Sequence, residues 1–213
     1  MQAMVLTRRA WIVSAASAGF AGDAAAAAPR GGIPLTLVSL GDSVLDCGHY
    51  NDAGVNPPRL LVHNDDRLFP DFRGRDLSSR GLAQLEHRAT DGATVDDLPR
   101  QARGLATTGR HVAILTVGGN DLLRGLAADR GAGLRAFEVA LDAFLRGLPQ
   151  RPVLMGNVYD PTFGDDARNF LGVEARIARA NHRRVNEVIG SWTCTRTSCA
   201  AMPRGSRTPS SRA

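Results

Sequence analysis

The fold of this chain is decided by the stretch Leu35-Thr36-Leu37-Val38-Ser39-Leu40-Gly41-Asp42-Ser43. A short apolar run rich in β-forming residues leads directly into Gly41, which is typical of a buried strand that ends in a sharp turn. Such a turn would place Ser43 at the carboxyl end of the strand, where open α/β sheets bind ligands. Ser43 is therefore a candidate nucleophile, although a lone serine here would also suit the N-cap of a following helix.

The alternation of buried strands and amphipathic helices continues along the chain. The long segment 46–79 has little apolar periodicity and predicts an ordered loop with a short helix. Because strands alternate with helices at βαβ spacing, we expect a parallel sheet covered on both faces, and the predicted fold class is α/β. Further strands are predicted at 85–89, 111–117 and 152–158, and helices at 94–103, 134–148 and 172–189.

Length and composition fit one folded domain. The chain has 213 residues, and much of its net charge of +5 comes from arginines near the two ends, with acids and bases interspersed between them. No basic stripe is interleaved with aromatic residues, so nucleic-acid binding is not expected. The three cysteines, Cys47, Cys194 and Cys199, give no disulfide framework and no zinc-type spacing. We expect no metal, no cofactor and no stable membrane insertion.

Residues 1–30 resemble an export signal. Paired arginines, Arg8 and Arg9, precede a modest apolar segment, and the Ala-rich stretch 24–28 offers small-residue cleavage sites. The paired arginines favour the twin-arginine class of bacterial signal, with a general secretory signal or a disordered tail as the alternatives. The mature domain would then span residues 31–190 and be periplasmic or extracellular.

Three predicted strand ends carry small residues beside polar ones. Gly41-Asp42-Ser43 follows the first strand, Asp91-Gly92 the second, and Gly118-Gly119-Asn120-Asp121 the third. Because the carboxyl ends of parallel strands meet at one edge of the sheet, we expect these clusters to converge. A hydroxyl beside backbone N–H groups and an amide side chain is an arrangement for acyl transfer, in which the donors stabilise a developing oxyanion. Each cluster alone would suit a capped strand-to-helix turn.

On these three clusters the chain resembles the SGNH (GDSL-type) hydrolases over roughly residues 35–189. The resemblance makes Ser43 the nucleophile and Gly92 and Asn120 oxyanion-hole donors, and the block that contains Asn120 is the most specific match. It implies a three-layer α/β/α sandwich with a parallel, flavodoxin-like sheet. The implied activity is hydrolysis of small-molecule esters without a metal, from acyl and aryl esters to acetylated sugars and lipids.

The chain departs from that family near its C-terminus, where the family carries Asp-x-x-His. No such pair follows Ile189, and a serine without a general base is a poor nucleophile. A non-catalytic binding module or a truncated pseudo-enzyme of the same fold is therefore an alternative. A nucleotide binder is disfavoured because no Gly-rich phosphate loop follows a strand. Of the five histidines, His49 and His63 could approach the site, and the others are expected to be structural, solvated or remote: His87, His111 and His182.

The composition changes abruptly at Ser191, after which Ser, Thr, Arg, Pro and Cys dominate. The chain contains no lysine, which indicates a GC-rich gene. When codons are read from the last base of the Ser191 codon, an aspartate codon is forced across Trp192 and Thr193. GC-rich choices then give Val-Asp-Val-His-Ala-His-Phe-Leu, an apolar strand end that delivers Asp and His. We interpret segment 191–213 as a frame-shifted end or, alternatively, as a natural disordered tail.

Overall fold

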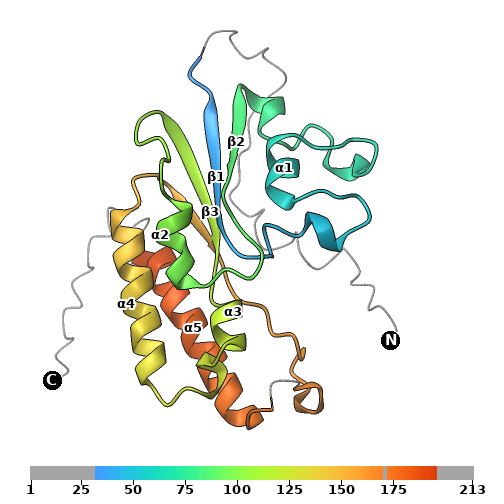
Figure 1. Cartoon of the computed structure of the whole chain (residues 1–213). Coiled ribbons are helices and arrows are strands. Elements are labelled where there is room, and N and C mark those ends of the chain that lie inside the picture. The colour runs from blue at the N-terminus through green and yellow to red at the C-terminus, as the bar shows by residue number, and fades with distance from the viewer. Residues whose placement is uncertain (1–31, 170–171, 196–213) are drawn as a thin grey trace, which may run out of the picture.

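A computed structural model describes residues 32–169 and 172–195, and in these ranges four strands form one parallel sheet (Figure 1). The sheet has the order β2-β1-β3-β4, which is the flavodoxin-like order over these four strands. In the register, Gly41 at the end of β1 lies opposite Thr116 at the end of β3. The strands are β1 (Leu35–Gly41), β2 (Ala83–His87), β3 (Arg110–Thr116) and β4 (Val153–Gly156).

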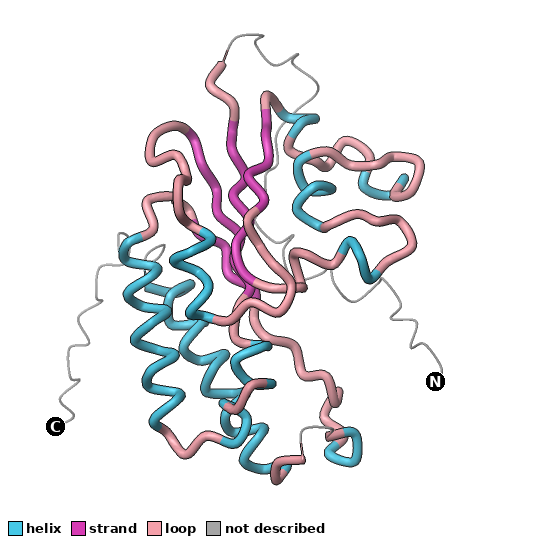
Figure 2. The backbone as a smooth tube through the Cα atoms, in the orientation of Figure 1, coloured by secondary structure: helices cyan, strands magenta, loops and turns pink. Residues whose placement is uncertain are grey.

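Helices and loops share the rest of the described chain about equally, the helices in cyan and the loops in pink in Figure 2. The long loop after β1 is ordered and contains one short helix, as predicted. The α-helices are α1 (Pro57–Val62), α2 (Leu98–Gln101), α3 (Gly119–Leu123), α4 (Ala132–Gly147) and α5 (Ala175–Thr195). The 3-10 helices are η1 (Gly48–Tyr50), η2 (Pro70–Phe72), η3 (Ser78–Arg80), η4 (Val95–Asp97), η5 (Leu126–Ala128) and η6 (Asp166–Arg168).

The helices lie on both faces of the sheet. Successive side chains of a strand point to opposite faces, so Val38 and Leu40 share one face of β1. These two residues belong to the main core, together with buried side chains of α2, α4 and α5. Helix α1 packs against β1 and β2 and lies on the other side of the sheet in Figure 1. The predicted three-layer α/β/α sandwich with a parallel sheet is therefore confirmed.

Most predicted elements have somewhat different limits in the structure: β3 and β4 correspond to the strands predicted at 111–117 and 152–158, and α4 corresponds to the helix predicted at 134–148. The strand predicted at 85–89 is β2, which begins and ends two residues earlier, and the N–H groups of Arg88 and Ala89 both donate to the carbonyl of Ser39. The helix predicted at 94–103 is the 3-10 turn η4 followed by the single-turn α2. A capping box between Thr94 and Asp97 begins this segment. Gly104 adopts a φ of +71° three residues after α2 ends.

The last helix extends beyond the predicted end of the domain. Helix α5 begins at Ala175 and continues to Thr195, whereas the sequence predicts a helix at 172–189 and a domain that ends at residue 190. Trp192 is half-buried against the main core, and the guanidinium of Arg146 lies 5.5 Å from its ring centre. The predicted export signal and residues 196–213 of the predicted tail lie outside the described residues. In the described part, no helix is long and apolar enough to cross a membrane.

Candidate active site

The turn after β1 is held by a glutamine from α2. Gln101 is buried; its Oε1 accepts from the N–H of Gly41 at 2.7 Å, and its Nε2 donates to the Gly41 carbonyl at 2.9 Å. Gly41 has a φ of +113°, and a Cβ there would lie 1.8 Å from the Thr116 carbonyl oxygen. Only glycine fits this position, because both the backbone angle and the contact with β3 exclude a side chain. The amide of Gln101 therefore fixes the backbone of Gly41, from which Asp42 and Ser43 follow.

Asp42 is buried beneath this turn. Its Oδ1 accepts from the Thr116 hydroxyl at 2.7 Å and from the N–H of Val44 at 3.1 Å. Burial raises the pKa of the Asp42 carboxyl, and these hydrogen bonds oppose that shift. With Asp42 turned inward, the next residue, Ser43, remains partly exposed.

Residues of the cluster after β3 hold the segment after β2 through hydrogen bonds. Asn120 donates from Nδ2 to the carbonyl of Ala93 at 2.9 Å, and the buried carboxylate of Asp121 accepts from the N–H of Val95 at 3.2 Å. Burial raises the pKa of Asp121. Gly92 adopts a φ of +75° in this tethered segment. Since the amide nitrogen of Asn120 carries two hydrogens, one remains for a second acceptor after the bond to Ala93.

Ser43 and Asn120 line the same pocket, whose volume is about 170 Å³. The pocket lies beyond the carboxyl ends of β1 and β3, and the segment 158–162 and α5 form its other walls. Gly92 is not among the lining residues, although the adjoining Ala93 carries the carbonyl that orients Asn120. The structure thus brings the predicted hydroxyl and amide together and places the predicted glycine next to the tether of that amide.

His182 also lines this pocket, a position that the sequence did not indicate. Its Nε2 lies 2.9 Å from the Val158 carbonyl oxygen and donates to it. Asn186, one turn later in α5, accepts from the N–H of Val158 through Oδ1 and donates to its carbonyl through Nδ2. The Nδ1 atom of this tautomer is an acceptor. Among the described residues, no hydrogen bond joins Ser43 to a histidine. The only signal in the sequence is the helical spacing of His182 and Asn186, which many surface residues share.

His49 approaches the second cluster instead of the serine. Its Nε2 lies 3.2 Å from Oδ2 of Asp91, and the Tyr50 hydroxyl donates to the same oxygen at 2.5 Å. The hydrogen bond from Tyr50 is the main reason why the pKa of Asp91 is lowered, and the same contact raises the pKa of Tyr50. Asp91 directly precedes Gly92. The exposed side chains of His49 and Tyr50 therefore contact the segment next to the site from its solvent side.

The other histidines do not line the pocket that contains Ser43. His87 hydrogen-bonds through Nδ1 to the Ser39 hydroxyl and through Nε2 to Asn56, which is the structural role expected of it. His111 lies near the start of β3, at the opposite end from the site. His63 is exposed just after α1.

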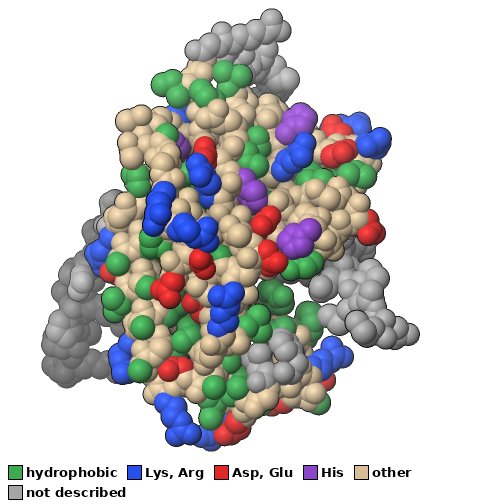
Figure 3. All heavy atoms as spheres, in the orientation of Figure 1, with side chains coloured by type: hydrophobic (Ala, Val, Ile, Leu, Met, Phe, Trp, Pro, Cys, Tyr) green, Lys and Arg blue, Asp and Glu red, His purple; other side chains and the backbone are tan. Residues whose placement is uncertain are grey.

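The lining of this pocket carries charges of both signs, such as those of Asp160 and Arg179. On the face shown in Figure 3, arginine and acidic side chains are interspersed. Within residues 32–169 and 172–195, no group of three or more His, Cys, Asp or Glu side chains could hold a metal ion. The one cysteine whose environment is described, Cys47, is a free thiol.

No family model and no curated protein matches the sequence. Among solved structures, the chain is similar to a variant of the esterase AlinE4, with 18% identity over 76% of this chain and 72% of that chain, at a TM-score of 0.46. It is also similar to a lipolytic G-D-S-L family member from Veillonella parvula DSM 2008, with 16% identity, coverage of 75% and 72%, and a TM-score of 0.45. For Axe2, an acetylxylan esterase from Geobacillus stearothermophilus, the values are 15% identity, 74% and 73% coverage, and 0.47. Because these identities and TM-scores are low, the roles of the site residues are inferred only from the geometry of this chain.

Proposed function

We propose that the chain is a serine hydrolase of small-molecule esters, with Ser43 as the nucleophile. The observation that carries this proposal is the pocket that Ser43 shares with Asn120, whose amide is oriented by the Ala93 carbonyl. The pocket is small and has apolar side chains such as Leu122 in its wall, which favours a short acyl group. No step of the proposed reaction requires a metal or a cofactor.

In the proposed reaction, Oγ of Ser43 forms a bond to the ester carbonyl carbon while its proton passes to a general base. The carbonyl oxygen becomes an oxyanion, which the N–H of Ser43 and Nδ2 of Asn120 would stabilise. The N–H of Gly92 is the third proposed donor, although Gly92 lies beside the pocket lining and not in it. Collapse of this intermediate expels the alcohol, which takes a proton from the base. Water then hydrolyses the acyl-serine by the same steps in reverse order.

The base has two candidate sources, and only the second is a residue of the printed chain. The first is the shifted reading of the codons after Ser191, which delivers Asp and His at the end of a strand. The second is His182, whose Nδ1 is an acceptor and which lines the pocket, although no hydrogen bond joins it to Ser43. We favour the first source, because His182 lines the pocket without a hydrogen bond to Ser43.

The nucleophile is tested by hydrolysis of p-nitrophenyl acetate in a frame-restored protein. Ser43→Ala should abolish turnover, and Asn120→Ala should lower kcat by about 100- to 1000-fold, the usual cost of one oxyanion donor. Ser78→Ala, at an exposed serine in η3, serves as the control and should retain full activity. Hydrolysis by Ser43→Ala at the parental rate would show that the nucleophile is assigned wrongly.

The source of the base is tested by comparing the chain as printed with the frame-restored protein. General-base catalysis contributes about 100- to 10,000-fold, so the restored protein should be faster by a factor in this range. If the printed chain is equally fast and loses its activity in His182→Ala, the base is His182. Resequencing of the gene through codons 188–200 tests the frameshift directly, and an uninterrupted reading frame would end that hypothesis.

The second candidate function is a non-catalytic binding module or truncated pseudo-enzyme. It is favoured by the finding that, in the part of the chain that the structure describes, no hydrogen bond joins Ser43 to a histidine. A fluorophosphonate probe separates the two functions, because it labels an activated serine and leaves an unactivated one untouched. Labelling of the printed chain at Ser43 would exclude the pseudo-enzyme. Absence of labelling in both the printed and the restored protein would exclude the esterase.

We also propose that the protein is exported, with residues 1–30 as the signal. The support is the paired arginines before an apolar and then Ala-rich segment. Fusion of these residues to a reporter should direct it across a bacterial inner membrane, and replacing Arg8 and Arg9 by lysine should block export by the twin-arginine route. Export that persists in the doubly substituted fusion would indicate the general secretory route instead.

A further inference from the structure

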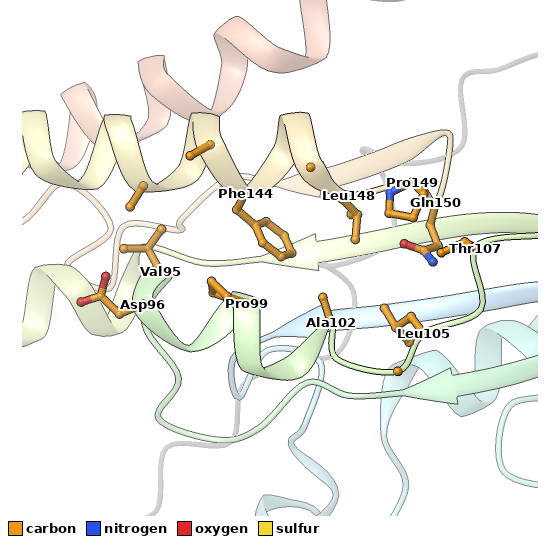
Figure 4. Close-up of a pocket in the computed structure, with 14 residues that line it drawn as sticks. Val95, Asp96, Pro99, Ala102, Leu105, Thr107, Phe144, Leu148, Pro149 and Gln150 are labelled. Atoms are coloured by element: carbon orange, nitrogen blue, oxygen red, sulfur yellow. The ribbon is translucent and has the colours of Figure 1, made fainter.

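A second pocket of about 680 Å³ lies between α2 with its following loop and α4, away from Ser43 (Figure 4). Its size falls in the range of small-molecule sites. We call it the α2–α4 pocket, and its walls are mostly apolar. The residues that carry this character include Val95, Pro99, Ala102, Leu105, Phe144 and Leu148.

One end of the α2–α4 pocket is formed by a buried glutamine. Gln150 is 1% exposed, and its Nε2 donates to the carbonyl of Ala106 at 2.6 Å. Its Oε1 has no hydrogen-bond partner among the described residues. In Figure 4 this oxygen is turned toward the interior of the pocket, on the side of Leu148. A buried acceptor without a donor is unfavourable and rare, so it requires an explanation.

The orientation of this amide is fixed by its surroundings. If the amide of Gln150 were reversed, its oxygen would face the carbonyl of Ala106, and two acceptors would oppose each other. The Nε2 group must therefore remain on Ala106, and the oxygen must remain on the pocket side. The pocket consequently has an unpaired amide acceptor, Oε1 of Gln150, at one end of its mostly apolar lining.

The opposite end of the α2–α4 pocket carries a carboxylate. Asp96 lies at the far end from Gln150 in Figure 4, and it is the acidic member of the lining. An anionic ligand would meet this carboxylate and an acceptor oxygen, without a cation among the lining residues. The lining thus selects against fatty-acid anions and favours a ligand whose polar group at the Gln150 end is a donor. Asp96 is exposed, so solvent screens its attraction for a cation and a neutral ligand suffices.

We propose that the α2–α4 pocket binds a neutral, mainly apolar alcohol whose hydroxyl donates to Oε1 of Gln150. The hydroxyl satisfies the unpaired acceptor, and the hydrocarbon part fills the space beside Phe144 and Leu148. This site shares no lining residue with the pocket of Ser43 and does not depend on the esterase proposal.

The test uses three probes with the same chain length: 1-octanol, its methyl ether, and octanoate. Each is titrated into the isotopically labelled full chain, and binding is followed by the side-chain amide of Gln150 and the backbone amides of Ala102 and Leu105. We expect 1-octanol to bind about tenfold more tightly than the ether, which lacks the donor, and octanoate to bind most weakly. Equal affinity of 1-octanol and its ether, or no response of these amides to any probe, would overturn the proposal.

Two variants and two controls make the test specific. Gln150→Met should remove the preference for 1-octanol over its ether, and Ala140→Leu should abolish binding of all probes because the new side chain fills the pocket. Gln84→Met, at an exposed glutamine of β2, should bind as the parent does. If Gln150→Met fails to fold, the ratio of octanol to ether in the parent and the result for Ala140→Leu decide the question. Ser43→Ala should bind 1-octanol like the parent, so failure of this proposal and failure of the esterase proposal are distinguishable.

Discussion

Replacement of Gln101 by methionine would remove the buried amide that holds the turn before Ser43. Methionine has a similar length and no polar group, so the main loss is the pair of hydrogen bonds to Gly41. The N–H of Gly41 would be left buried without a partner, at a cost of about 1–3 kcal/mol. The carbonyl of Gly41 still accepts from the N–H of Thr90 at 2.9 Å, so loss of the second bond costs only about 1 kcal/mol.

We therefore expect Gln101→Met to lower the free energy of unfolding by about 2–4 kcal/mol. With a urea m value of about 2 kcal/mol/M, the midpoint should move down by about 1–2 M. Gln84→Met is the matched control, because Gln84 also donates an amide to β1, at the Thr36 hydroxyl, but lies exposed. Its midpoint should move by less than about 0.3 M, as is usual for exposed positions. Equal shifts of the urea midpoint in the two variants would refute the conclusion that the hydrogen bonds between Gln101 and Gly41 stabilise the turn.

Two further predictions concern the same turn. Gly41→Ala should yield no folded protein, because its Cβ would lie 1.8 Å from the Thr116 carbonyl oxygen, whereas Gly54→Ala, in open space at a φ of +62°, should cost only about 1–2 kcal/mol in urea unfolding. Comparable stability of the two variants would contradict the contact with β3. Burial raises the pKa of Asp42 in the folded state above its ordinary value of 3.8. The contribution of the protonated carboxyl to the free energy of unfolding is therefore complete below pH 3.8 and is lost as the pH rises through the raised pKa. Asp42→Asn should therefore gain stability relative to the parent between pH 3 and pH 7, and a constant difference across this range would disprove the effect of burial.

Much of the fold could be predicted because it depends on local patterns. The apolar runs of β1 and β3 end in glycine, and the parallel order of the strands then brings three polar clusters to one edge. The placement of Ser43 and Asn120 in one pocket follows from this topology. These features require no knowledge of which side chains meet across the sheet.

Contacts between distant side chains could not be predicted in the same way. Gln101 is sixty residues from Gly41, and a lone polar residue in a one-turn helix has no periodic signal that reveals its partner. His182 reaches the pocket because α5 packs with that side toward Val158, a direction set by tertiary packing. Helix α5 continues to Thr195, beyond the predicted end at residue 189, and Trp192 in this extension packs against the main core, a contact that local composition does not reveal.

The proposed reaction needs both an oxyanion hole and a general base, and the hydrogen bonds of the described residues concern the first of these. The amide of Gln101 holds the turn before Ser43, and the carbonyl of Ala93 holds the amide of Asn120, so this turn and this proposed donor are preorganised whether or not a base is present. A preorganised oxyanion hole stabilises charge that develops only after the nucleophile attacks, and attack by a neutral hydroxyl is slow. A chain with this site and no base should therefore fold and bind a transition-state analogue while it turns over slowly. Restoring the base should then raise the rate with little change in stability, since none of the hydrogen bonds that hold the turn depends on it.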